Sequence, residues 1–221
     1  MPKKKKITLI IISSIVGALA LALIIPFSIL GIRTNSINTK YQYLKDDETY
    51  SNKEEVTGIE LVTQHISCGY ATIEMMSSYY GNKITEDELS DKNHGNITTS
   101  SSDGFLKELK KSVPDRKFVK HSYLNNDVLL KEICIALAND QPVALEWAAK
   151  YEGEWTLHFS LITSIDIKND NITIYNPYGY IENIHLGEFI SRSSFNAYKN
   201  MPLFLNFGFA FGAFEKNTIF Y

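Results

Sequence analysis

The chain has few cysteines and no basic stripe in its main part. Only Cys68 and Cys134 occur among its 221 residues, too few for a disulfide framework or a zinc cluster. Its five histidines are scattered without metal-ligand spacing, so we expect no metal and no other cofactor. A net charge of −3, with no basic stripe after the first six residues, argues against a nucleic-acid partner. Because no GxxxxGK[S/T] motif occurs, any transporter that acts with this protein must be a separate chain.

Charge is absent from residues 7–32, and this run is long enough to cross a bilayer, which needs about 20 apolar residues. Lysines occupy positions 3–6, and only Arg33 follows closely. The positive-inside rule therefore predicts a cytoplasmic tail at 1–6, a signal-anchor helix at 7–32 and an external remainder. A cleaved signal peptide is the alternative, since Ala18-Leu19-Ala20 resembles a cleavage site. Cleavage there would leave an apolar N-terminus, which favours the uncleaved anchor.

The remaining chain divides into a polar part and a folded part. Residues 33–56 are polar and lack apolar periodicity, which predicts a stalk. Residues 57–221 contain enough apolar sequence for one domain. Up to residue 141 the patterns predict helices, with a capping box from Thr85, a cap at Ser102, and a cap at Asn125 or Asn126. From Pro142 short β-branched runs predict strands, and residues 203–221 are interpreted as a final hairpin with its turn at Lys216-Asn217. The class predicted is α+β.

The stretch QHISCGYATIEMMSSYYG, residues 64–81, places a cysteine at the start of a predicted helix that Gly81 ends. Unpaired backbone N–H groups and the helix dipole favour negative charge at such a position. Cys68 would then ionise more readily and act as a nucleophile. The alternative is a small buried apolar residue. Cys134 falls among apolar residues of a predicted helix, where packing is its expected role.

A histidine and an asparagine are predicted to lie together on two neighbouring strands. His158 begins the run HFSLITSI, and Asn176 nearly ends the run NITIYNP. With a loop at 166–170, Ile165 would pair with Asn171, and Asn176 would face Ser160. His158 lies two residues from Ser160, on the same face, within reach of Asn176. The amide oxygen of Asn176 could then orient the imidazole, although each residue alone is more often a polar residue near a turn.

These motifs, in this order, resemble the papain-like cysteine peptidases of the bacteriocin-processing type, which cut double-glycine leader peptides and have many stand-alone relatives. The resemblance runs from about Gly58 to Phe195. It implies a papain-like fold, in which a helical lobe bears the nucleophile and an antiparallel sheet lobe follows. Carried over by position, Cys68 would be the nucleophile, His158 the general base and Asn176 its orienting partner. Gln64 would donate to the oxyanion, although relatives usually have this Gln further before the Cys.

The function implied is a membrane-anchored peptidase that cleaves peptides or proteins through a thioester, on the outer side of a bacterial cell membrane. A separate transporter or secretion system is a conceivable partner. Acyl transfer by the same residues is one alternative. A catalytically silent peptide-binding module is another, and the spacing of Gln64 keeps this alternative open. A disulfide between Cys68 and Cys134 would also silence the enzyme.

Overall fold

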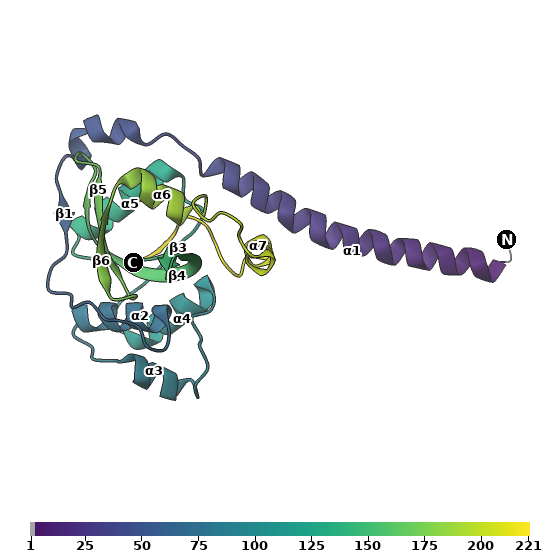
Figure 1. The fold of residues 1–221 in the computed structure, drawn as a ribbon, viewed down its shortest axis with the longest axis horizontal. Coiled ribbons are helices and arrows are strands. Elements are labelled where there is room, and N and C mark those ends of the chain that lie inside the picture. The colour runs from purple at the N-terminus through teal and green to yellow at the C-terminus, as the bar shows by residue number, and fades with distance from the viewer. Residues whose placement is uncertain (1–2) are drawn as a thin grey trace.

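The computed structural model describes residues 3–221, so the first two residues of the predicted tail lie outside it. A long helix, α1 (Lys3–Ser36), extends away from the folded domain (Figure 1). Its stretch Ile10–Ser36 is long and apolar enough to cross a membrane and is exposed to the surroundings. Length and composition would suit a signal sequence near the N-terminus equally well.

The segment predicted as a stalk instead packs on the domain. It forms two short 3-10 helices, η1 (Gln42–Asp46) and η2 (Glu48–Tyr50), and a strand, β1 (Glu54–Glu55), that pairs with β4. Ile37, Leu44 and Val56 are buried. These three apolar residues are too widely spaced along the chain to show periodicity. The sequence pattern therefore did not indicate that they are buried in the domain.

The helices before residue 141 follow the prediction closely. They are α2 (Cys68–Tyr79), α3 (Glu86–Lys92), α4 (Ser102–Ser112) and α5 (Asn126–Ala138). The Thr85 capping box is confirmed, because the Thr85 hydroxyl accepts from the Glu88 backbone while the Glu88 carboxylate accepts from the Thr85 backbone. The cap of α4 is Ser101 rather than Ser102, and α5 begins after Asn125.

An antiparallel sheet forms the centre of the domain. Its strands are β2 (Lys120–His121), β3 (Val143–Tyr151), β4 (Glu154–Asp166), β5 (Asn171–Asn176), β6 (Tyr180–Ile184) and β7 (Thr218–Phe220). Their spatial order is β2-β7-β3-β4-β5-β6, with β1 joined to β4. The predicted α+β class is confirmed, with helices before the sheet and α6 (Leu186–Ser193) and α7 (Leu203–Ala210) after it.

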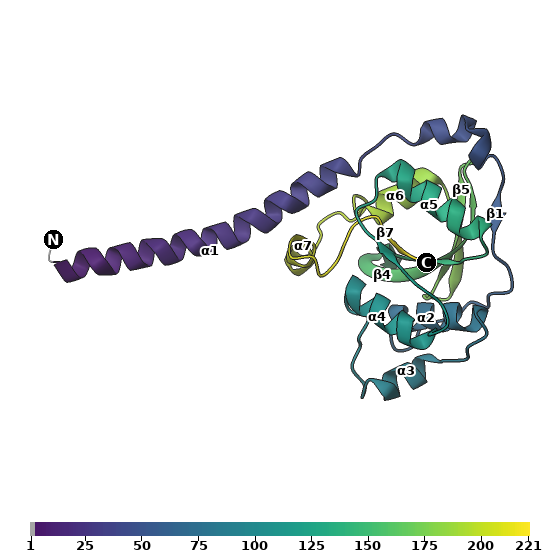
Figure 2. The ribbon, with the colours of Figure 1, turned by 180° about the vertical axis from the view of Figure 1, so that it is seen from behind.

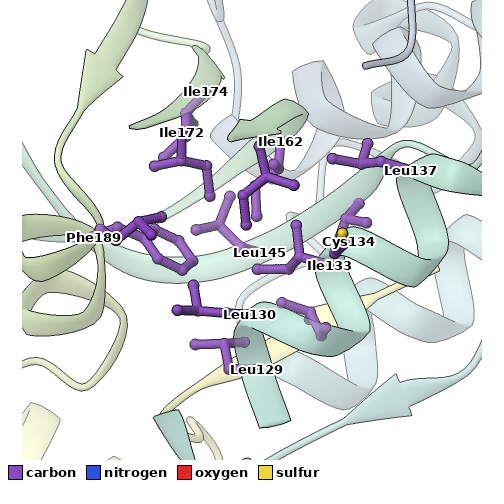
Figure 3. Packing of buried hydrophobic residues seen from close by; sticks show 14 of the residues in the cluster. Leu129, Leu130, Ile133, Cys134, Leu137, Leu145, Ile162, Ile172, Ile174 and Phe189 are labelled. Carbon is purple, nitrogen blue, oxygen red and sulfur yellow. The ribbon is translucent and has the colours of Figure 1, made fainter. Parts of the chain in front are cut away.

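Helices cover both faces of this sheet (Figures 1 and 2). One apolar cluster joins α5 and α6 to Leu145, Trp147 and Ile162, and part of it is drawn in Figure 3. The other joins α2 and α4 to Ala144, Phe159, Leu161 and Phe220. Neighbouring residues of β3 thus enter opposite clusters, which explains why the sequence VALEWAA is almost continuously apolar.

The prediction of a C-terminal hairpin for residues 203–221 is wrong. The first half of this segment is the helix α7, which rests on the domain through Leu205 and Phe209, one helical turn apart. A Cβ on Gly208 would lie 2.4 Å from the Phe214 ring, so glycine allows this close packing. Its second half is β7, which pairs with β2 and β3 rather than with residues 201–214. Because Asn206 is the one polar side chain of α7, the sequence shows no clear helical period there.

Leu44→Ala tests whether the 33–56 segment belongs to the domain. We expect the free energy of unfolding to fall by about 2–5 kcal/mol, because a fully buried leucine leaves a cavity. The neighbouring exposed residue of η1 supplies the control, Gln42→Ala, which should change it little. Denaturant unfolding of the detergent-solubilised chain, followed by Trp147 fluorescence, measures both. Equal, small effects would restore the stalk interpretation.

Candidate active site

Cys68 is the first residue of α2, as predicted. Ser67 before it is extended, so the chain turns into the helix at the cysteine. The next residue must be small, since a Cβ on Gly69 would lie 2.3 Å from the Thr99 hydroxyl oxygen and 2.4 Å from its Cβ. The Cys-Gly pair is therefore explained by packing, with the loop at Thr99 pressed against the first turn of the helix.

A buried carboxylate fixes the loop that leads to Cys68. Glu86 of α3 accepts hydrogen bonds from the backbone N–H groups of His65, Ile66 and Ser67, at 2.8, 3.3 and 3.2 Å. The imidazole of His65 also contacts Glu86 and Asp87, at 2.6 and 3.0 Å. This loop therefore keeps its shape, and His65 is held against α3.

The predicted neighbours His158 and Asn176 are hydrogen-bonded, with 2.8 Å between Nε2 and Oδ1. The predicted register was wrong at the turn, where Ile165 pairs with Ile172. An irregularity between Ile162 and Ser164 shifts the pairing by one residue, so that Leu161 pairs with Tyr175 as the prediction required. The loop is shorter than predicted, and the bulge shifts the register back by one residue. The pairing of the strands near His158 is therefore the predicted one.

The amide of Asn176 has only one orientation that satisfies its neighbours. Its Nδ2 donates to Glu182 Oε1 at 2.7 Å, and a carboxylate at that position only accepts. Its Oδ1 therefore faces His158 and also accepts from the Tyr178 backbone N–H at 2.9 Å. Because Oδ1 only accepts, His158 Nε2 must carry the proton, which leaves Nδ1 as the basic nitrogen of the neutral ring. Nδ1 is buried and has no hydrogen-bond partner among the described residues.

Glu182 is in turn held by Arg192 of α6. The guanidinium donates to both carboxylate oxygens, at 2.5 and 3.0 Å, and through Nε to the Ala148 carbonyl at 2.8 Å. It also lies over the Trp147 ring, 3.6 Å from its centroid. This cation compensates the partly buried Glu182 charge. A continuous chain of contacts thus runs from α6 through Glu182 and Asn176 to His158.

The imidazole of His158 is enclosed. Tyr178 stacks on it with 4.0 Å between ring centroids, and its hydroxyl lies 2.8 Å from the Thr156 hydroxyl. Burial lowers the pKa of His158 to about 3, the Asn176 hydrogen bond acts in the opposite direction, and the charge of Arg192 lowers it further. His158 is therefore a neutral ring at pH 7.

Burial also raises the pKa of the Cys68 thiol to about 11, although the backbone groups of Phe159, Gly69 and Cys68 itself act to lower it. The structure therefore departs from the expected easy ionisation at a helix start. Here the free energy needed to remove a thiolate from water exceeds the stabilisation that the helix N-terminus provides. Because the backbone of Phe159 acts on the sulfur, the sulfur lies beside β4. Phe159 directly follows His158 in that strand.

A cavity of about 470 Å³ opens at Cys68. Apolar residues form most of its wall, including Ile66, Phe159 and three residues of the C-terminal segment, Phe204, Leu205 and Phe214. Gln64 also lines it, and the Gln64 backbone donates to the Pro177 carbonyl at 2.7 Å. The Gln64 side-chain oxygen is buried without a partner among the described residues. The structure thus brings Cys68 and Gln64 to one cavity, and His158 and Asn176 to the strands behind it.

The disulfide alternative does not hold in this structure, where both cysteines are free. Cys134 packs with α5 on one face of the sheet, and Cys68 packs with the cluster on the other face. Cys134 is buried among apolar residues, as predicted. Within residues 3–221 no group of three His, Cys, Asp or Glu side chains is placed to hold a metal.

Sequence reasoning missed Glu86, Tyr178, Glu182 and Arg192. Glu86 and Arg192 lie ten or more residues from the groups they hold, whereas Tyr178 and Glu182 follow Asn176 within six positions. The pair Glu182 and Arg192 forms no sequence motif, because their contact depends on how α6 packs against the sheet. An acceptor for the Asn176 amide could have been anticipated, since a buried primary amide needs partners on both sides.

An α+β domain with a cysteine at a helix start and a buried His–Asn pair on adjacent strands is thus defined. The model of the Peptidase_C39 like family matches residues 55–202, and the chain belongs to this family. No curated protein matches the chain. Among solved structures it is similar to a double glycine motif protease from an AMS/PCAT transporter, crystallised with the leader peptide. That match has 16% identity and a TM-score of 0.44, and covers 63% of this chain and 91% of the other.

Alkylation across pH tests the protonation state of Cys68. Because its pKa is raised to about 11, the thiolate fraction should grow steadily up to that value, with no reactive plateau at pH 5–8. Mass spectrometry of the iodoacetamide-treated chain separates Cys68 from Cys134, whose pKa burial also raises to about 11. A low-pH reactive limb at Cys68 that vanishes in His158→Ala would contradict the neutral pair.

Proposed function

We propose that this protein is a membrane-anchored cysteine peptidase with Cys68 as nucleophile, His158 as general base and Asn176 as orienting residue. The observation that carries the proposal is the fixed tautomer of His158. Its Nε2 is committed to Asn176, so Nδ1 is free to accept a proton beside the strand residue that contacts the sulfur. Membership of a peptidase-like family supports hydrolysis of peptide bonds.

In the proposed reaction the thiol proton moves to His158 Nδ1 as the Cys68 sulfur attacks the peptide carbonyl carbon. The tetrahedral oxyanion accepts hydrogen bonds from the Cys68 backbone N–H, which is free at a helix start, and from the Gln64 amide. The imidazolium then protonates the leaving amine, and a thioester remains on Cys68. Water attacks the thioester while Nδ1 takes its proton, and the acid is released with the thiol restored.

The neutral resting pair determines how this chemistry would start. A thiol with a raised pKa and an imidazole with a lowered pKa do not exchange their proton before substrate binds. Attack and proton transfer would therefore occur together, as in general-base catalysis by an uncharged pair. The same pKa values favour a second candidate function, a catalytically silent module that binds peptides in the cavity at Cys68.

The proposed location follows from α1. The helix would serve as a single-pass anchor, with the lysines at 3–6 in the cytoplasm and the domain outside a bacterial cell. A peptide or protein would be the substrate. A separate transporter or secretion system would deliver it to the outer side of the membrane.

Cys68→Ala should abolish peptide cleavage, with a loss on the order of 10³-fold or more, since the nucleophile is removed. Cys134→Ala removes the other thiol and should retain activity. The assay incubates the detergent-solubilised chain with a peptide library and identifies products by mass spectrometry. Hydrolysis yields a free acid, whereas acyl transfer to an added amine yields an amide. Undiminished cleavage by Cys68→Ala would exclude the proposed nucleophile, and no cleavage with retained peptide binding would favour the silent module.

Glu182→Gln should lower kcat by about 10-fold to 100-fold, because the Asn176 amide loses its fixed acceptor and can turn away from His158. Glu188→Gln is the matched control, since Glu188 also touches Arg192, at 3.4 Å, but not Asn176. Asn176→Asp alone should be impaired by carboxylate repulsion with Glu182, and the double variant Asn176→Asp/Glu182→Gln should recover. Equal effects of the two Gln variants would assign Glu182 a general structural role.

A further inference from the structure

The helix α7 has Asn206 as its one polar side chain and is otherwise apolar, yet it is only partly covered. Residues 200–214 contain no charged side chain. Leu205 and Phe209 are buried against the domain, whereas Leu203, Phe204 and Phe211 are 69%, 67% and 58% exposed. A helix that is apolar all round is normally buried in protein or in a membrane. A contiguous exposed apolar surface of this kind indicates an interaction site.

This exposed helix lies beside the candidate membrane helix. In both views α7 projects from the domain on the side from which α1 departs (Figures 1 and 2). The ring of Phe207 meets Phe27 of α1 edge to face, with 5.4 Å between centroids. Pro26 and Leu30 of α1 share a cavity of about 300 Å³ with Phe209 and Phe211. The apolar surface of α7 is therefore continuous with that of α1.

Arg33 and Tyr123 mark the level at which α1 would leave the bilayer. The guanidinium lies over the Tyr123 ring, 4.9 Å from its centroid, and these residue types favour the lipid headgroup region. Phe27 precedes Arg33 by six positions, about 9 Å along a helix at 1.5 Å per residue. Interfacial elements insert their apolar face about 5–10 Å into the headgroup–acyl boundary. Phe207, in contact with Phe27, lies at that depth.

We propose that α7 lies in the interface of the bilayer that α1 crosses, with Leu203, Phe204 and Phe211 facing lipid. The inference rests on the anchoring role proposed for α1. Phe204 and Leu205 also line the cavity at Cys68. The cavity therefore opens beside the lipid headgroups, and it takes its peptide at the membrane surface rather than from bulk solvent.

Depth-dependent fluorescence quenching tests this placement. The full chain, carrying one added tryptophan, is reconstituted into phosphatidylcholine vesicles with or without phosphatidylcholine brominated on its acyl chains. Leu203→Trp and Phe211→Trp report on α7, and Leu19→Trp reports on the middle of α1. Lys168→Trp, in the exposed β4–β5 turn on the side of the domain away from α7, is the matched control. The unsubstituted chain supplies the background from Trp147 and Trp155.

We expect quenching at positions 203 and 211 to approach that at position 19 and to exceed that at position 168 several-fold. If only position 19 is quenched, the anchor stands and the placement of α7 is overturned. Cross-linking through position 203 would then show whether a second copy of the chain covers α7 instead. If position 19 is also unquenched, the proposed anchor itself fails. Quenching requires no turnover, so an inactive enzyme leaves every outcome readable.

Discussion

The orientation of one buried amide controls the chemistry available to this site. Asn176 can satisfy Glu182 only with its Nδ2, so its Oδ1 must face His158. That single choice places the imidazole proton on Nε2 and leaves Nδ1 as the unprotonated nitrogen. The choice depends in turn on Arg192, which donates to both carboxylate oxygens of Glu182 and holds it in place. A carboxylate at position 176 would orient the ring without such help, but it would lie against Glu182. The asparagine and the Glu182–Arg192 pair therefore form one unit.

Burial shifts the pKa values of both reactive groups in this site toward their neutral forms. Tyr178 and the sheet exclude water from His158, and Cys68, which is partly buried, lies in the wall of a mostly apolar cavity. Both groups are consequently neutral, because neither charge is compensated by solvent. In a general-base mechanism this neutrality is compatible with catalysis, since the ion pair needs to exist only as the bond to sulfur forms. The apolar cavity in front of Cys68 would then provide binding energy without competing charges.

The C-terminal segment links the candidate site to the long N-terminal helix α1. It begins as α7, which lines the cavity and touches α1, and it ends as β7, which pairs with β3 at the centre of the domain. One short stretch of chain thus connects three regions of the protein. Together with the 33–56 segment, which is packed rather than free, it fixes the domain close to α1 instead of suspending it on a flexible tether.

The sequence by itself determined the features that depend on local chemistry. Helix starts, the capping box, the apolar period of the early helices and the β-branched runs predicted the α+β class and placed Cys68 at a helix start. Alternation along strands also predicted that His158 and Asn176 meet. The tertiary structure decided whatever depends on contacts distant in sequence: the burial that sets the pKa values of Cys68 and His158, the support of Asn176 by Arg192, and the packing of residues 33–56. It also decided the helical form of residues 203–210, because a segment with Asn206 as its one polar side chain has no clear period from which either structure can be inferred.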